Sequence, residues 1–411
     1  MSNSTQSTIA YPDLSPESFM LHEVASAESS YSVGKSKIYS FFSGAGFLDL
    51  GFEFDGRYKI QFVNEYCLPF IQSYRFSRVN LGLPEPSYGY STMDISWMLQ
   101  PEKFKRIRSM VEKDKEGRSP IGFIGGPPCP DFSVGGKNRG KEGENGKLSG
   151  VYTDLICQLE PDFFLFENVK GLYRTKKHRA FFDEMKTKLQ NAGYELTERL
   201  INALWYGAPQ DRERILLLGF KKGSPRLQND VAAMVSHFPW QEQEREDSQN
   251  LKDLPWPERD SFTVKGERLP PKGIPLELTV QHWFDKNNVG KHLNAEHFFQ
   301  PRAGLAKFKV IDEGDDKKKS YKRLHRWRYS PTAAYGNNEV HLHPYQARRL
   351  SVAEALAIQS LPANFLIPPT ITLSNMFKTI GNGVPFLVSQ GLAKTLGNFM
   401  SLPESIERVA S

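Results

Sequence analysis

Short apolar runs alternate with amphipathic stretches along the first half of the chain, from Lys37 onward. Each run has the length of a strand and is apolar on both faces; the five runs are IYSFF (38–42), KIQFVN (59–64), IGFIGG (121–126), DFFLFEN (162–168) and RILLLGF (214–220). Strands with two apolar faces are typical of parallel sheets buried under helices. The pattern predicts an α/β fold with a doubly wound, Rossmann-like parallel sheet.

Amphipathic helices are expected between these runs and at the end of the chain. Before Gly193, which is typical of a helix end, one helix face carries Phe181, Phe182, Met185 and Leu189. Ser351 and Glu354 form a capping-box pair, which opens a helix expected to end near Pro362. A last helix follows Pro385, and we expect it to pack on the first domain through one apolar stripe, formed by Val388, Leu392, Leu396 and Phe399.

The periodic texture ends near residue 221, and this change divides the chain. Residues 222–345 combine many prolines, charges and aromatics with weak periodicity. Residues 1–36 are rich in Ser and lack apolar periodicity, so they are expected to form a flexible tail. The sequence predicts two further parts: a first domain over 37–221 that residues 372–411 complete, and a smaller, irregular domain over 222–371.

Composition narrows the class of protein only modestly. At 411 residues, with 39% hydrophobic and 24% charged residues, the chain is typical of a globular protein long enough for two domains. The formal net charge of +6 favours an acidic partner such as nucleic acid, but many enzymes that bind none are equally basic.

Cysteine usage and the lack of long apolar stretches indicate a cytoplasmic protein. Cys67, Cys129 and Cys157 form an odd, sparse set, which is typical of a reducing compartment without a disulfide framework. No CxxC pair is present, so no cysteine-based zinc site is expected. The N-terminus has no apolar signal core, and no stretch is long and apolar enough to span a membrane.

The first strand leads into FSGAG (42–46), which has the features of a nucleoside site. Gly44 and Gly46 allow a ligand close to the backbone, and the following helix offers free N–H groups. Glu65 ends the second strand, 21 residues after Gly44, where a carboxylate suits ribose hydroxyls. Asp94 can accept a hydrogen bond from an adenine amino group. A dehydrogenase-like nucleotide site and a simple tight turn remain open on these residues alone.

The segment GGPPCPDFS (125–133) follows a buried strand and is the candidate chemical centre. Its prolines fix the direction of the Cys129 thiol, at the edge of the sheet where α/β enzymes bind ligands. The Gly-rich basic loop GGKNRGK (135–141) can move and contact phosphates. A buried, inert cysteine is the commoner role of this residue type, but the Pro-Pro-Cys-Pro loop with its basic flank disfavours it.

Glu167 ends the next run, in FENV. The apolar residues Phe163–Phe166 place its carboxyl beside apolar surface, and burial raises a carboxyl pKa. Such a group can donate a proton near neutral pH. Judged on this residue alone, a solvated glutamate at a strand end is the favoured alternative.

Together with three later motifs, these segments resemble the cytosine carbon-5 methyltransferase family. The later motifs are YGAPQDRER (206–214), RRLSVAEALAIQSLPANF (348–365) and IGNGVP (380–385), and all six occur in family order. The resemblance covers nearly the whole chain outside 1–36 and 222–320. Phe47 stands where the family usually has a further glycine, which would tighten the cofactor pocket; Pro130 stands where it often has glutamine, which would stiffen the catalytic loop.

The resemblance implies a reaction and roles for four side chains. Cys129 would add to carbon 6 of cytosine, and the resulting enamine would take a methyl group at carbon 5 from S-adenosylmethionine. Glu167 would hydrogen-bond the ring at N3 and its amino group, and Arg214 would hold the carbonyl oxygen of the base. Arg212 and backbone N–H groups are candidates for stabilising the thiolate. The base that removes the carbon-5 proton is not identified.

The resemblance also implies how the ligands are held. The residues expected to line the S-adenosylmethionine pocket are Phe42, Gly44, Gly46, Glu65, Tyr66, Asp94, Ile95, Pro127 and Asn382. The attacked ring atoms are hidden inside a duplex, so the cytosine must swing out of the stack, and the loop 135–141 is the candidate for closing over it. No metal is required, and His341 and His343 are expected to be solvated or structural.

The domain over 222–371 is expected to choose the target sequence in double-stranded DNA. Its basic stretch KKKSYKRLHRWR (317–328) can track phosphates, and its arginines can read guanine edges; a solvated charged loop is the alternative. The acidic DEGDD (312–316) is expected to stay away from DNA. A single compact recognition region resembles bacterial restriction–modification methylases, which act as monomers beside a restriction endonuclease for the same site.

Three other functions fit parts of the sequence less well. A tRNA cytosine methyltransferase shares these motifs, but a recognition region longer than about 100 residues, together with Pro130 and the Phe132-Ser133 pair, favours DNA. A non-catalytic DNA-binding regulator would not need the intact catalytic set. An NAD-linked oxidoreductase would leave PPCP, FENV and QDRER unexplained.

Overall fold

The computed structural model describes residues 34–128, 144–227, 230–264, 266–301, 304–317, 320–333, 335 and 340–401. The predicted nucleophile Cys129, its neighbour Pro130, the loop 135–141 and residues 1–33 of the predicted tail lie outside the described residues. Every described residue falls in one compact unit that begins at Gly34. Within these ranges, no helix is both long and apolar enough to cross a membrane.

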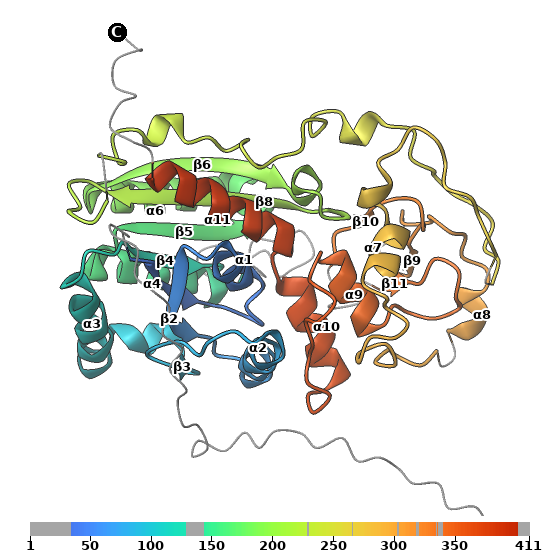
Figure 1. Cartoon of the computed structure of the whole chain (residues 1–411), viewed down its shortest axis with the longest axis horizontal. Helices are drawn as coiled ribbons and strands as arrows, with labels where there is room; N and C mark the ends of the chain where they lie inside the picture. The colour runs from blue at the N-terminus through green and yellow to red at the C-terminus, as the bar shows by residue number, and fades with distance from the viewer. Residues whose placement is uncertain are drawn as a thin grey trace, which may run out of the picture. The chain divides into compact units, whose positions relative to one another are not determined.

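A seven-stranded sheet occupies the centre of the region over 36–221 (Figure 1). Its strands are β1 (Ser36–Phe41), β2 (Tyr58–Asn64), β3 (Tyr90–Ser91), β4 (Ile121–Gly125), β5 (Phe163–Val169), β6 (Tyr194–Asn202) and β8 (Glu213–Lys221). Their order is β3-β2-β1-β4-β5-β8-β6, and the first five are parallel. The doubly wound α/β fold is confirmed. The chain reverses its direction of travel across the sheet at β1, so a ligand crevice is expected at the carboxyl ends of β1 and β4.

The strand direction differs from the prediction at one edge. The run 214–220 forms β8, which is antiparallel to both β5 and β6, so the prediction of a parallel strand there is wrong. An apolar run predicts that a strand is buried on both faces, and β8 is buried in this way. The run does not predict whether the strand is parallel or antiparallel to its neighbours. The run pattern also misses β6, because most of its residues are half-buried at the sheet edge.

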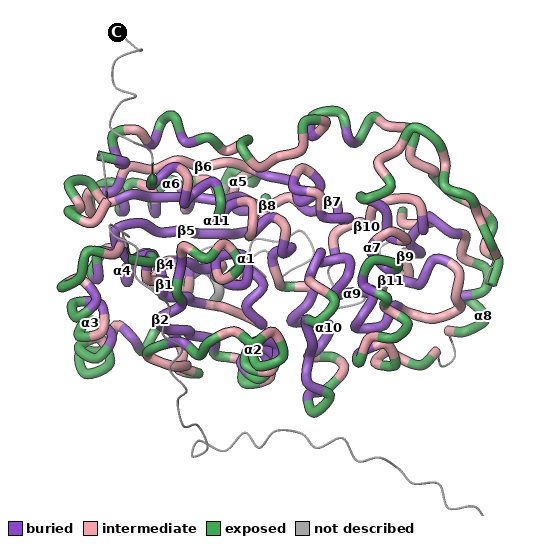
Figure 2. Tube along the Cα trace, viewed as in Figure 1, coloured by how far each residue is buried: buried purple, intermediate pink, exposed green. Residues whose placement is uncertain are grey.

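Helices cover both faces of the sheet, as the two-sided runs predict. Along β5, Phe163 and Leu165 join one apolar cluster, and Phe164 and Phe166 join the other. The first cluster includes side chains of α1 and α11; the second includes side chains of α3, α4 and α6. Figure 2 shows the central strands as buried, whereas α2 and α3 mix buried and exposed residues. The helices are α1 (Phe47–Asp55), α2 (Leu68–Leu81), α3 (Pro101–Lys115), α4 (Glu144–Leu159), α5 (Lys170–Arg174), α6 (Lys176–Asn191) and α11 (Phe386–Met400).

The three helices expected from amphipathic patterns are present. α6 ends at Asn191, and Gly193 follows with a φ of 85°. α9 (Val352–Ile358) opens with the predicted capping box, in which the Ser351 hydroxyl accepts from the Glu354 amide and the Glu354 carboxylate accepts from the Ser351 amide. The stripe of α11 is buried and packs beside α1, which confirms the expected return of the last helix to the region of the first strands (Figure 1).

The segment 222–371 has little regular structure, as its prolines predict. Its short elements are η4 (Val235–His237), η5 (Leu251–Asp253), η6 (Leu276–Leu278), α7 (Val280–Lys286), α8 (Leu305–Phe308), β9 (Lys322–Arg323), β10 (Ser330–Pro331), β11 (His341–Leu342) and α9. β10 pairs with β7 (Gln210–Asp211), which carries the start of the QDRER motif. α10 (Leu373–Asn382) then leads back to the sheet. Side-chain and strand contacts therefore join this segment directly to the residues after β6.

Candidate active site

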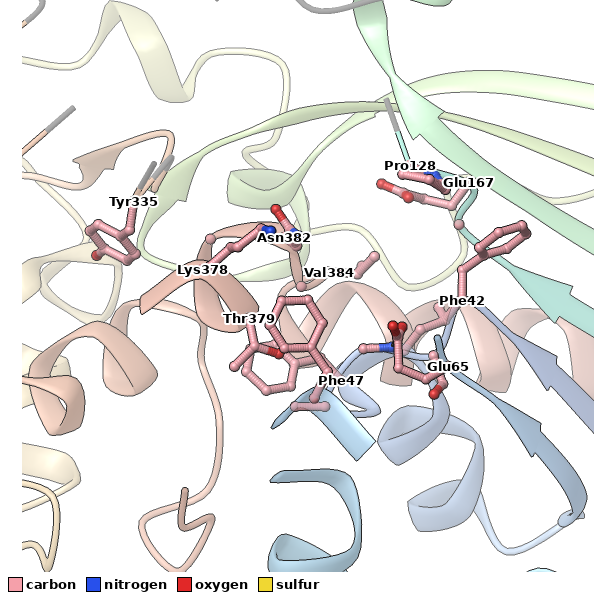
Figure 3. Close-up of a pocket in the computed structure, with 18 of the residues that line it drawn as sticks. Phe42, Phe47, Glu65, Pro128, Glu167, Tyr335, Lys378, Thr379, Asn382 and Val384 are labelled. Carbon is pink, nitrogen blue, oxygen red and sulfur yellow. Dashed lines mark hydrogen bonds between the residues drawn. The ribbon is translucent and has the colours of Figure 1, made fainter. Parts of the chain in front are cut away.

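A cavity of about 1600 Å³ opens at the carboxyl ends of β1, β2, β4 and β5 (Figure 3). One wall comes from the sheet loops, and the facing wall comes from α10 and from the segment 320–350. Eleven of the predicted site residues line it: Phe42, Gly44, Glu65, Tyr66, Asp94, Ile95, Pro127, Glu167, Arg212, Arg214 and Asn382. The structure thus brings five separate sequence motifs to one space, where the reversal of strand order predicts a ligand site.

Gly46 is the predicted pocket residue that does not line this cavity. It caps α1 with a φ of 74°, and a Cβ atom there would lie 2.4 Å from the Tyr74 ring and 2.6 Å from the Arg78 guanidinium. Gly44, with a φ of 58°, differs, because a Cβ atom there would meet nothing within 4 Å. Gly44 therefore leaves open space on the cavity side of the loop, whereas Gly46 allows α2 to approach the loop from behind.

Glu65 is held at the end of β2 by backbone donors. Its two carboxylate oxygens accept from the Gly44 amide (2.9 Å) and the Cys67 amide (2.7 Å). Burial raises the pKa of this carboxyl, and the two amides and nearby Lys378 oppose the rise. A carboxylate fixed in this way has lone pairs left for ligand hydroxyls. Asp94 caps η1 (Ile95–Leu99) by accepting from the Ser96 amide through Oδ1.

Glu167 forms an ion pair with Arg214 at the other end of the cavity. The Arg214 Nε lies 2.9 Å from Glu167 Oε1. Glu167 is 8% exposed, and burial raises its pKa while Arg214 and Arg212 oppose the rise. The expected raised pKa is confirmed, and the solvated alternative is wrong. The sequence did not indicate the Arg214 partner, because the two residues lie on antiparallel β5 and β8, a direction that the apolar runs do not show.

Arg212 is buried and binds backbone carbonyls on the facing wall. It donates to the carbonyls of Gly381 (3.0 Å) and Ala333 (3.2 Å). Its neighbour Gln210 donates weakly to Ile358 and accepts from the Ala333 amide. These contacts tie the QDRER motif to the segment 222–371 and to α10. The geometry therefore favours a role for Arg212 in positioning the two walls.

The structure describes the segment that precedes Cys129 as far as Pro128. Pro127 and Pro128 follow β4 and line the cavity, and the Asn168 amide group donates to the Pro127 carbonyl (3.2 Å). A Cβ atom on Gly126 would lie 2.7 Å from Glu167 Oε2, so the β4 loop passes directly over that carboxylate. Cys129 itself lies outside the described residues, and its predicted role stays a prediction.

The arginines of the basic stretch 317–328 do not have the expected exposure. Arg323 is fully buried and donates to four backbone carbonyls, those of Phe308, Ile311, His343 and Gln346. Arg326 forms a two-pronged ion pair with buried Glu313, and Arg328 pairs with Asp316. The expectation that these arginines read guanine edges is wrong for Arg323 and Arg326, which are buried and already bound by backbone carbonyls and by Glu313.

His341 and His343 are buried and uncharged. Burial lowers the pKa of each to about 3, so the solvated alternative is wrong and the structural one holds. Among the described residues, no cluster of three or more His, Cys, Asp or Glu side chains is arranged to hold a metal ion. Lys378, Thr379 and Tyr335 also line the cavity, although no motif marks them in the sequence (Figure 3).

Comparison with known proteins identifies similar chains over nearly the same length. The family model described as C-5 cytosine-specific DNA methylase matches residues 36–398. Type II methyltransferase M.NmeDI of Neisseria meningitidis serogroup C is 58% identical over 366 residues, covering 89% of this chain and 84% of that protein. Type II methyltransferase M.FnuDI of Fusobacterium nucleatum is 28% identical over 395 residues, covering 90% and 97%.

Solved structures show the same fold at lower sequence similarity. A putative DNA modification methyltransferase encoded within a prophage of E. coli superposes with a TM-score of 0.54 and 21% identity. The match covers 90% of this chain and 100% of that chain. At this identity the likeness concerns the fold alone.

Proposed function

Since the chain belongs to the C-5 cytosine-specific DNA methylase family and is a DNA cytosine-5 methyltransferase, we propose that it transfers the methyl group of S-adenosylmethionine through a covalent Cys129 adduct. The target would be a cytosine flipped out of double-stranded DNA at a specific sequence. The observation that carries the proposal is the cavity itself, which joins the Glu65 end to the Glu167–Arg214 pair without a dividing wall.

The Glu65 end has features that suit a nucleoside. The open space beside Gly44 admits a ligand close to the loop, and the anchored Glu65 carboxylate can accept bonds from ribose hydroxyls. Asp94 would accept from the adenine amino group. The other residues proposed to contact the cofactor are Phe42, Tyr66, Ile95, Pro127 and Asn382. When bound, S-adenosylmethionine supplies a methyl group on positively charged sulfur, which a carbon nucleophile can take.

The chain's own residues would prepare the base. Cys129 forms a bond from sulfur to carbon 6, and the electron pair of the 5–6 double bond becomes available at carbon 5. Glu167, whose pKa is raised by burial, donates a hydrogen bond at N3 and accepts one from the amino group. Arg214 holds this carboxyl and faces the carbonyl oxygen of the base. After methylation, loss of the carbon-5 proton to a base and departure of Cys129 restore the ring.

In this proposal, two parts of the chain have different functions. Residues 37–221 and 372–411 would carry the cofactor and the chemistry, and residues 222–371 would choose the sequence. The ring atoms of a stacked cytosine are inaccessible, so the base must leave the helix before it reaches Glu167. A monomer that protects host DNA beside a restriction endonuclease would be consistent with the Type II relatives.

Transfer of labelled methyl groups to genomic DNA and to total tRNA tests this function. Wild type and Cys129→Ser are compared, and bisulfite sequencing locates the product. Label in DNA at one short recurrent sequence, with wild type only, is the expected result. Label in tRNA alone would move the substrate to RNA, and label in DNA with Cys129→Ser at the wild-type rate would remove the covalent step.

A further inference from the structure

We propose that Arg78 is a positioning residue, which holds the loop 42–46 in its cofactor-binding shape from the side opposite the cavity. The inference rests on the proposed binding of S-adenosylmethionine at this loop. Arg78 belongs to α2, outside all six motifs in the sequence, and it does not line the cavity. It would act on the cofactor only through the backbone of the loop.

Two adjacent carbonyls of the loop are bound by this one guanidinium. Arg78 Nη1 donates to the Ala45 carbonyl (3.0 Å), and Nη2 donates to the Gly46 carbonyl (2.6 Å). Arg78 is 1% exposed, so water does not compete for these bonds. Two bonds from one planar group fix both the distance and the orientation of consecutive peptide units.

The guanidinium is itself held by its surroundings. Glu53, on α1, accepts from Arg78 Nη2 at 2.7 Å and from Nε at 3.1 Å. The Tyr74 ring lies under the guanidinium, 3.9 Å from its central carbon. The hydroxyl of Tyr74 donates in turn to buried Asp49 of α1 (2.9 Å). Arg78 therefore reaches the loop from a fixed platform that spans α1 and α2.

The orientation of these carbonyls decides which way the loop amides point. In a planar trans peptide the N–H points away from the C=O, so a Gly46 carbonyl turned toward Arg78 turns the Phe47 amide toward the opposite, cavity side. Phe47 is the first residue of α1, where amides have no partner within the helix, and it lines the cavity. The Gly44 amide is engaged with Glu65. The Gly46 carbonyl also accepts from the Leu50 amide (3.0 Å), so Arg78 and the first turn of α1 together set the donor directions of the proposed cofactor loop.

A substitution of Arg78 must keep its positive charge, because two carboxylates lie near it. Arg78 pairs with Glu53 and lowers the pKa of buried Asp49, so its loss would leave both carboxylates less compensated. Arg78→Lys keeps the positive charge but cannot span two carbonyls with a planar fork. A matched control is Arg226→Lys, because Arg226 also pairs with a buried carboxylate, Asp162 (2.8 Å), at the amino end of β5, away from the cavity.

Isothermal titration of S-adenosylmethionine into wild type, Arg78→Lys and Arg226→Lys tests the inference. We expect Arg78→Lys to raise the Kd for S-adenosylmethionine about tenfold or more, equivalent to about 1.4 kcal/mol, and Arg226→Lys to leave it within about twofold. The KM for S-adenosylmethionine should rise in parallel, while kcat at saturating cofactor and the Kd for DNA stay within about threefold. If Arg78 had only a structural role, Arg78→Lys would lower thermal stability without raising the KM for S-adenosylmethionine selectively over kcat and the Kd for DNA.

The outcomes separate the inference from the proposed function. Wild type that fails to bind S-adenosylmethionine would remove the function itself. Wild type that binds, with a folded Arg78→Lys that binds equally well, would overturn the role of Arg78 alone. If Arg78→Lys does not fold, Glu53→Gln decides, because it loosens the guanidinium and leaves its carbonyl bonds: a Kd raised about threefold or more supports the inference, and an unchanged Kd overturns it.

Discussion

A Cβ atom on Gly383 would lie 2.1 Å from Cδ2 of Phe47, so these two residues are complementary in size. Phe47 begins α1, and Gly383 lies just after α10. Both residues line the cavity, and the contact of the Phe47 ring with Gly383 closes one side of it. The same ring packs edge-on against Phe365, with 5.2 Å between centroids. The large residue at 47 is therefore accommodated by the absence of a side chain on a segment near the other end of the chain.

Gly383→Ala should damage this contact by steric overlap alone. The φ of Gly383 is −66°, which alanine adopts without strain. We expect a loss of about 1–3 kcal/mol in the free energy of unfolding through overpacking, together with weaker S-adenosylmethionine binding, because Phe47 lines the cavity. Urea unfolding and calorimetric titration measure the two effects.

Gly150→Ala is the matched control for this substitution. Gly150 lies within α4, and a Cβ atom there meets nothing within 4 Å. Alanine should be neutral or stabilising by up to about 1 kcal/mol at such a helical position. If Gly383→Ala were equally harmless, the ring of Phe47 would have room that the structure does not show.

Glu167→Gln should separate chemistry from cofactor binding. Glutamine keeps the size of the side chain but cannot act as an acid, so we expect methyl transfer to DNA to slow by about 10²–10⁴-fold. The Kd for S-adenosylmethionine should be unchanged, since Glu65 and Asp94 are intact. Single-turnover transfer of labelled methyl groups gives the rate. Glu198→Gln, on edge strand β6 and paired with Lys186 (2.9 Å), is the control; a Glu167→Gln rate equal to that of the control would rule out the proposed role.

The sequence predicts the buried strands of this site but not how the neighbouring strands pair. Apolar runs report burial, so β4 and β5 are predicted and Glu167 is placed on β5, although that strand continues past it to Val169. They do not report direction, so the pairing of Glu167 with Arg214 across antiparallel strands is not foreseen.

Buried charges are the second class of feature that sequence patterns miss. A run of basic residues looks the same whether its members face solvent or not. Arg323 binds four carbonyls that come together only after folding. Arg78, on α2, binds carbonyls of the loop 42–46, which precedes it by more than thirty residues in the sequence. Neither contact leaves a periodic signal in the chain, because the partners lie in irregular backbone.

Asp49 should make stability depend on pH. Burial raises its pKa to about 6 from the ordinary 3.8, although Arg78 opposes the rise. Between about pH 4 and pH 6 the folded protein therefore binds more protons at this group than the unfolded chain does. Its contribution to stability falls as the pH rises through that window and is lowest above about pH 6.

Asp49→Asn removes this titration and isolates its effect. The variant loses an acceptor for the Ser40 or Tyr74 hydroxyl, a cost that does not vary with pH. We expect the stability of the variant relative to wild type to improve by on the order of 1–3 kcal/mol from about pH 4 to about pH 7. Urea unfolding at a series of pH values measures the difference, and a constant difference would show that Asp49 does not titrate in this range.

Arg326 and Glu313 should behave as a structural pair rather than as readers of DNA. Arg326 Nε and Nη2 donate to the two oxygens of Glu313 at 2.8 and 2.9 Å, and Glu313 is fully buried. Arg326→Ala would remove the closer partner of that carboxylate and leave the Arg268 guanidinium beside it (3.4 Å), at an expected cost of up to about 3–5 kcal/mol. Replacing both residues by leucine removes both charges and should cost less.

Lys317, in the same basic stretch but exposed, provides the contrast. Lys317→Ala should leave stability unchanged, and any phosphate contact it makes would appear as a salt dependence of DNA binding that is shallower by about one unit. The sequence methylated by the folded fraction of Arg326→Ala, read by bisulfite sequencing, should be that of wild type, because the guanidinium is committed inside the fold. An Arg326→Ala protein with wild-type stability and a changed target sequence would show that the arginine leaves Glu313 to contact bases, as the charge pattern alone suggests.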